Sequence, residues 1–116
     1  MPVGIDIVDI DRIESAAARW GDAFLKRIFT DSELRLYAAK PASLAARFAA
    51  KEAVIKALGA RPSRYTDIEI LSAPGGRPEL HLYCHAGELA DKLAPKGIDI
   101  SLSHERHYAV AVAHFD

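Results

Sequence analysis

The chain has 116 residues, of which 50% are hydrophobic and 27% charged, and its formal net charge at pH 7 is −1. This length suits one domain, residues 1–116, with a single modest core, and the near-zero charge excludes a global field that recruits nucleic acid or an anionic membrane. The sequence has no apolar run near the roughly 20 residues of a membrane span and no basic leader, and its one cysteine, Cys84, excludes an internal disulfide. We therefore expect a cytoplasmic protein.

The first half of the chain predicts one strand followed only by helices. Apolar residues alternate at the start, and Gly21 and Gly59 are placed to end helices. The expected elements are a strand over 3–8, a helix from a cap at Asp9 or Asp11 to about Trp20, further helical turns over 24–29, a short helix opened by the capping box Thr30-x-x-Glu33, and a long helix over 41–58.

The second half predicts two hairpins separated by a helix. The expected elements are strands over 66–71 and 79–83, a helix over 85–93, and strands over 98–103 and 108–115. In the last strand Ala109, Ala111 and Ala113 give a close-packed face, to be covered by a helix or by another subunit. Together these elements predict an α+β fold, a small single domain with a mostly antiparallel sheet packed on one long core helix.

The long helix places three charged residues at the rim of its own apolar stripe. Lys51 projects along the stripe, Glu52 lies at its edge, and Lys56 follows one turn after Glu52. Burying an unpaired charge costs several kcal/mol, which favours a bound partner for these groups. The alternative is a solvated Glu52–Lys56 pair worth about 0.2–0.5 kcal/mol, and the helix alone favours that interpretation.

Asp6 is a second candidate, because it interrupts a strand that is otherwise apolar or glycine. A strand covered on both faces would bury Asp6, which must then be hydrogen-bonded, metal-bound or neutralised. The strand alone is equally consistent with a hydrogen-bonding role and a functional one. Together, Asp6 and Glu52 can bind a hard cation such as Mg²⁺. Lys51, Lys56 and Arg47 can then supply positive charge for a polyphosphate.

The turn over 103–107 is a third candidate. His104, beside Ser103 and two residues before Arg106, is placed to bind a phosphate. The histidines have no accompanying cysteines, which argues against zinc. A Ser103–His104 nucleophile pair is disfavoured, because adjacent residues at a strand end point to opposite faces.

Three blocks of sequence carry a family resemblance. They are G-I-D-I-V-D-I-D-R-I-E over 4–14, R-F-A-A-K-E-A-V-I-K-A-L-G over 47–59, and S-L-S-H over 101–104 followed by Y-A-V-A-V-A over 108–113. With these blocks the chain resembles the holo-acyl-carrier-protein synthase type of 4′-phosphopantetheinyl transferase. The resemblance implies that family's fold and its reaction, which transfers 4′-phosphopantetheine from coenzyme A to a serine hydroxyl of apo acyl carrier protein and releases adenosine 3′,5′-bisphosphate.

The resemblance also implies roles for individual residues. Asp6 and Glu52 would hold magnesium against the coenzyme A pyrophosphate, and Glu52 would accept the serine proton, either directly or through a metal-bound water. Lys56 would face the pyrophosphate and stabilise the leaving group. Three further residues match family positions that contact the coenzyme A phosphates: Arg47, Lys51 and His104. Arg12 matches the position that contacts the acidic carrier protein. The family typically forms a homotrimer with the coenzyme A cleft between subunits.

One segment departs from the family pattern. Related enzymes usually have a glycine-rich G-x-G-x-G loop where residues 59–65 read G-A-R-P-S-R-Y. We hypothesise that Arg61 and Arg64 replace backbone contacts with side-chain charge, while Glu105 places a negative charge beside the expected phosphate site. Two alternatives to the enzyme are a catalytically idle coenzyme A-binding relative, which the retained carboxylates and lysines disfavour, and a structural domain whose charges form surface pairs.

Overall fold

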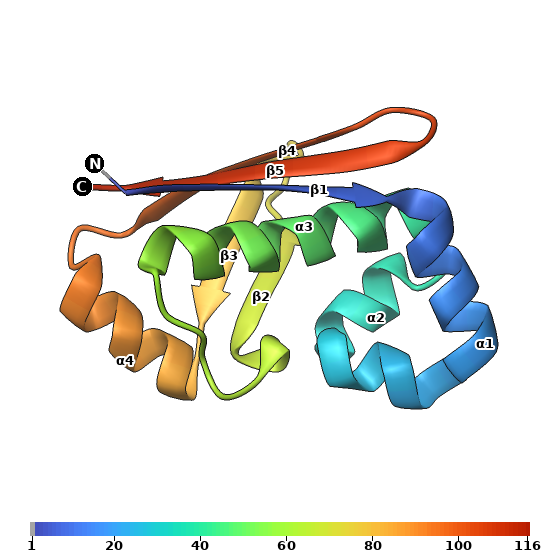
Figure 1. Cartoon of the computed structure of the whole chain (residues 1–116), viewed down its shortest axis with the longest axis horizontal. Helices are drawn as coiled ribbons and strands as arrows, with labels where there is room; N and C mark the ends of the chain where they lie inside the picture. The colour runs from blue at the N-terminus through green and yellow to red at the C-terminus, as the bar shows by residue number, and fades with distance from the viewer. Residues whose placement is uncertain (1) are drawn as a thin grey trace.

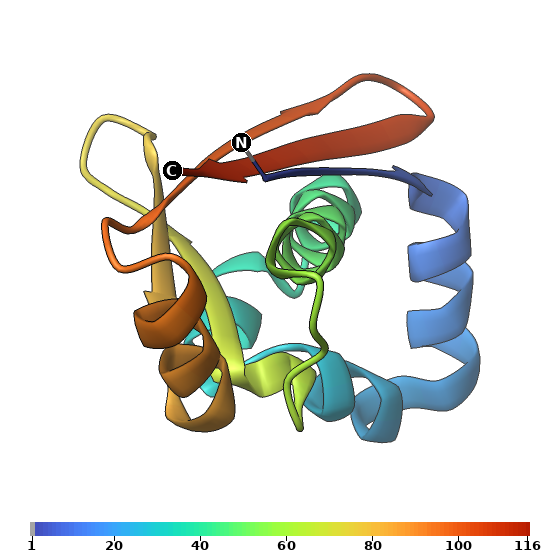
Figure 2. The ribbon, with the colours of Figure 1, turned by 60° about the vertical axis from the view of Figure 1, so that its left-hand side comes forward.

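Helix α3 (Pro41–Leu58) is the centre of the computed structural model, which describes residues 2–116. The other elements are β1 (Val3–Asp9), α1 (Ile10–Ile28), α2 (Asp31–Tyr37), β2 (Ile68–Ser72), β3 (Pro78–Leu82), α4 (Cys84–Leu93), β4 (Ile98–His104) and β5 (Tyr108–Phe115) (Figure 1). Figure 2 shows α3 nearly end-on, with β1, β4 and β5 above it, α1 to its right, and β2, β3 and α4 to its left. Among the described residues, no helix is both long and apolar enough to span a membrane.

The strands form two antiparallel sheets, ordered β1-β5-β4 and β2-β3. The predicted α+β class, with antiparallel strands packed on one long core helix, is confirmed. The strand boundaries agree with the prediction to within two residues. The largest shift is at β2, which begins at Ile68 because residues 65–67 form a 3-10 turn closed by the Ile68 N–H on the Tyr65 carbonyl.

Local sequence signals fix the helix ends as predicted. The Asp9 side chain caps α1 by accepting the N–H of Asp11 at 2.9 Å, and Gly21 kinks the same helix with a φ of 62°. Thr30 and Glu33 form both hydrogen bonds of the capping box that opens α2. Gly59 ends α3 in the left-handed conformation, with a φ of 68°, which glycine adopts without steric cost.

The inner face of the larger sheet packs directly on α3. Ala109, Ala111 and Ala113 are all buried there, so the helix, and not another subunit, covers the small-residue face of β5. On β1, a Cβ added at Gly4 would overlap the Ala53 carbonyl and lie 2.7 Å from the Ala57 amide nitrogen. Glycine therefore lets β1 approach α3 closely, which brings the next inward residue, Asp6, to the helix.

The outer face of the same sheet is open. Val3, Ile5 and Ile7 are 61–65% exposed, and Ile5 and Ile7 pair across the ladder with Val112 and Val110. The expectation that a cover on both faces of β1 buries Asp6 is therefore wrong for the single chain. Asp6 is partly buried because α3 covers one face, whereas the opposite face presents an apolar stripe to solvent.

Candidate active site

Asp6 and Lys56 meet where β1 crosses α3. The Lys56 ammonium donates to the Asp6 carboxylate at 3.1 Å and to the Ile5 carbonyl at 2.9 Å. The Asp6 side chain is 18% exposed and that of Lys56 is 53% exposed. This pair is thus held by a flexible, solvated ammonium, whose net contribution to stability is about 0–1 kcal/mol. Lys56 can exchange Asp6 for another anion at little cost.

Glu52 lies one turn before Lys56 on the same face of α3, the helix that Asp6 contacts through Lys56. Its carboxylate, 15% exposed, does not pair with Lys56. It accepts a hydrogen bond of 2.6 Å from the Tyr65 hydroxyl and one of 3.4 Å from Arg61. The alternative of a solvated Glu52–Lys56 pair is not found among the described residues, where Lys56 contacts Asp6 and Glu52 contacts Tyr65 and Arg61.

The donor set at Asp6 and Glu52 fits Mg²⁺ better than a metal that needs many protein ligands. Among residues 2–116 no group of three or more His, Cys, Asp or Glu side chains gathers to hold a metal. Mg²⁺ is commonly bound by one or two carboxylates, with waters and substrate phosphates completing its octahedral shell. Asp6, whose partner is the Lys56 ammonium, and Glu52, whose partners are the Tyr65 hydroxyl and Arg61, are partly exposed carboxylates of the kind that such a site uses.

Lys51 has a structural role in this fold. Its ammonium, 0% exposed, donates to Glu33 at 2.8 Å and to the carbonyl of Ile68, while Glu33 also accepts the N–H of Ile70 at 2.9 Å. Burial lowers the pKa of Lys51, and the charge of Glu33 opposes that shift. The expectation that Lys51 contacts coenzyme A is contradicted by this position, because a fully enclosed ammonium cannot touch a bound ligand.

Arg47 is also largely engaged within the chain. It is 6% exposed, lies over the Tyr37 ring at 3.5 Å, and donates to the Ile70 carbonyl at 3.0 Å and to the Ser72 hydroxyl at 3.0 Å. Ser72 is exposed at the end of β2, so the guanidinium lies close to the surface there. Arg47 can meet a phosphate at that point if the ligand takes the place of the Ser72 hydroxyl.

His104 lies on the same face of the sheet as Asp6. The register aligns Asp6 with Leu102, and His104 follows two residues later on the same strand. Two strand spacings and a two-residue offset separate the Cα atoms of Asp6 and His104 by roughly 12 Å. His104 is exposed. A ligand that touches both residues must therefore be extended.

Glu105 was expected to place a negative charge beside the phosphate site at His104. In the structure its carboxylate is hydrogen-bonded within the turn between β4 and β5. Its carboxylate accepts the N–H of His107 at 2.6 Å and that of Tyr108 at 2.8 Å. The backbone N–H of His107 is the main cause of the lowered pKa of Glu105. The charge therefore stabilises the β4–β5 turn.

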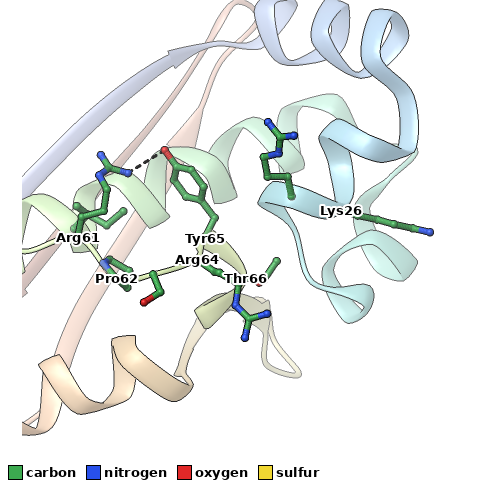
Figure 3. Close-up of a pocket in the computed structure, with 9 residues that line it drawn as sticks. Lys26, Arg61, Pro62, Arg64, Tyr65 and Thr66 are labelled. Carbon is green, nitrogen blue, oxygen red and sulfur yellow. Dashed lines mark hydrogen bonds between the residues drawn. The ribbon is translucent and has the colours of Figure 1, made fainter.

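Two pockets meet at Tyr65. One, of about 320 Å³, lies between β1, α1 and α3 and extends from Asp9 and Arg12 to the Tyr65 ring. The other, of about 390 Å³, lies between the end of α1 and the loop over 59–65 (Figure 3). Arg12 is exposed on α1 at the mouth of the first pocket. Tyr65 carried no distinctive sequence signal, and only the folded loop reveals its position between both pockets.

Comparisons with known proteins agree with one another. The family model of the 4′-phosphopantetheinyl transferase superfamily matches residues 2–113. A holo-[acyl-carrier-protein] synthase of Dehalococcoides mccartyi (strain CBDB1) is 53% identical over 110 residues, which cover 94% of this chain and 92% of the relative. The crystal structure of Helicobacter pylori holo-[acyl-carrier-protein] synthase in complex with coenzyme A has a TM-score of 0.85 at 34% identity, covering 98% of this chain and 99% of that chain. The Neisseria meningitidis enzyme gives a TM-score of 0.84 at 29% identity, with 97% and 94% covered.

Proposed function

The chain belongs to the 4′-phosphopantetheinyl transferase superfamily, and on that premise we propose how its site carries out the family's reaction. The protein is a holo-acyl-carrier-protein synthase, which transfers 4′-phosphopantetheine from coenzyme A to a serine hydroxyl of apo acyl carrier protein and releases adenosine 3′,5′-bisphosphate. The contact of Lys56 with Asp6, one helical turn from Glu52, is the observation that carries the assignment of the site.

Asp6 and Glu52 are the residues we assign to hold Mg²⁺. When bound, Mg²⁺ would neutralise charge that develops on the pyrophosphate oxygens. Both carboxylates are partly exposed, and both face cations that can turn to phosphate oxygens instead. Glu52 also accepts the serine proton as the hydroxyl attacks the β-phosphorus of coenzyme A. The bond from that phosphorus to the bridging oxygen then breaks.

Cationic residues bind and orient the two substrates. Lys56 contacts the pyrophosphate and stabilises the charge on the departing adenosine 3′,5′-bisphosphate. His104 and Arg47 contact other coenzyme A phosphates, Arg47 where it meets Ser72 at the surface. Arg12, exposed beside the pocket between β1, α1 and α3, meets the acidic carrier protein. A cytoplasmic location is part of the same proposal.

We further propose that the protein works as a homotrimer with the coenzyme A cleft between subunits. The stripe formed by Val3, Ile5 and Ile7, each more than 60% exposed, supports self-association through the outer face of the larger sheet. Contiguous apolar surface of this kind is unusual on a protein that stays monomeric. The trimer and its shared cleft are inferences from this surface and from the family.

Intact-mass spectrometry of apo acyl carrier protein, incubated with coenzyme A, Mg²⁺ and this protein, tests the function. The carrier is expected to gain the phosphopantetheine mass with the wild type and to gain none with Glu52→Gln at an unchanged Tm. Glu88→Gln, which alters an exposed carboxylate on α4, is the matched control and should act like the wild type. If the wild type binds coenzyme A but the carrier gains no mass, the protein is a catalytically idle coenzyme A-binding relative. Full turnover by Glu52→Gln would show that Glu52 has no part in the mechanism.

A further inference from the structure

Both oxygens of the Glu52 carboxylate are held by the loop over 59–65. The Tyr65 hydroxyl donates to one oxygen at 2.6 Å, and Arg61 donates to the other at 3.4 Å. Arg61 also donates to the Tyr65 hydroxyl at 3.1 Å, and Figure 3 shows these two side chains pointing toward each other. The three groups therefore form a closed triangle of hydrogen bonds around the carboxylate.

Tyr65 is the anchored member of the triangle. Its ring packs against Phe48, with 5.8 Å between ring centroids, and its carbonyl accepts from the buried Lys51 ammonium at 3.4 Å. Arg61, by contrast, is 58% exposed, and its guanidinium lies 5.6 Å from the centre of the Tyr65 ring.

Arg64 shows that the triangle is specific to one arginine of the loop. Its side chain points away from Tyr65 in Figure 3, and it approaches Asp67 at 3.9 Å. The two arginines of the shortened loop thus face different carboxylates, and only Arg61 faces Glu52.

We propose that Tyr65 is a positioning residue that fixes the orientation of the Glu52 carboxylate for the transfer reaction, with Arg61 supporting the Tyr65 hydroxyl. This inference rests on the proposed function. A carboxylate on a flexible side chain populates several rotamers, and the hydrogen bond from the Tyr65 hydroxyl favours one of them. Small misplacements of a catalytic group cost large factors in rate, so loss of the hydroxyl is expected to lower kcat about tenfold.

Tyr65→Phe and a matched control test the proposal. The variant removes only the hydroxyl, and it is expected to lower kcat about tenfold while the KM for coenzyme A stays within about twofold of the wild type. The control is Tyr83→Phe, which removes a 2.9 Å hydrogen bond from a tyrosine hydroxyl to Glu69, away from the site. It should keep the wild-type kcat. A kcat for Tyr65→Phe within twofold of the wild type, or equal losses in both variants, overturns the proposal.

The double variant separates positioning from a structural effect. Arg61→Ala, at an exposed side chain, is expected to lower kcat about threefold. The kcat of the double variant Arg61→Ala/Tyr65→Phe should lie within about twofold of that of Tyr65→Phe alone, because both residues act through Glu52. Multiplicative losses in the double variant overturn the proposal. If Tyr65→Phe does not fold, an unchanged kcat in Arg61→Ala overturns it. A wild type without transfer activity would instead refute the proposed function.

Discussion

Lys51→Met is expected to damage stability far more than Lys56→Met, although both lysines lie on α3. The Lys51 side chain and its partner Glu33 are 0% exposed, whereas Lys56 is 53% exposed. Removing one member of a buried pair leaves the other charge buried and unpaired, which costs about 3–5 kcal/mol. An exposed pair contributes only about 0–1 kcal/mol to stability. A domain of 116 residues has an unfolding entropy of about 0.24 kcal/mol/K, so the Lys51→Met loss lowers Tm by about 12–20 °C.

Urea denaturation and thermal melting followed by circular dichroism measure both losses. Lys56→Met is the matched control: it should keep its Tm within about 4 °C of the wild type but lose phosphopantetheine transfer. In a double-mutant cycle, Lys51→Met/Glu33→Met should be more stable than the sum of the single losses implies, by about 1–3 kcal/mol. Equal Tm values for Lys51→Met and Lys56→Met, or strictly additive losses in the cycle, would refute the structural assignment of Lys51.

Arg12→Glu is expected to raise the KM for apo acyl carrier protein, with a smaller effect at high salt, and to leave the KM for coenzyme A unchanged; equal rises in both would contradict the role of Arg12. Ile5→Glu places a charge on the exposed stripe and should reduce the assembled protein to monomers in light scattering after gel filtration, whereas an unchanged mass would exclude that face as the interface. Gly4→Ala forces a methyl group against the Ala53 carbonyl and should cost about 1–3 kcal/mol in urea denaturation; a variant as stable as the wild type would contradict the close approach of β1 to α3.

The features that the sequence predicts well are those with local causes. Caps, kinks and strand periods depend on neighbours within a few residues, so the cap at Asp9, the kink at Gly21 and the stop at Gly59 could be placed without tertiary knowledge. The sequence also predicted that Asp6 lies close to α3, through its expected pairing with Glu52, and in the structure Gly4 permits that approach. The family resemblance then predicts that the site lies at this convergence.

The partners of the charged groups were not predictable in the same way. Glu33 has the local signature of a capping-box residue, and the sequence gives no reason to expect that its carboxylate also neutralises a lysine 18 residues later in the chain. Lys51 consequently resembled a phosphate ligand. The contact between Tyr65 and Glu52 depends on the path of a loop without periodicity, so only the folded chain reveals it.

Exposure also explains why Lys56, and not Lys51, suits a phosphate. Releasing Lys51 from Glu33 would leave two buried charges without partners. Lys56 needs only to exchange the Asp6 carboxylate for a phosphate oxygen. That exchange frees Asp6 for a cation, so we expect Mg²⁺ and coenzyme A to strengthen each other's binding, as thermodynamic linkage requires of any coupled pair. Calorimetric titration of coenzyme A with and without Mg²⁺ should show tighter binding with the metal, and the gain should shrink in Lys56→Met. A gain of the same size in that variant would show that Lys56 does not couple the two ligands.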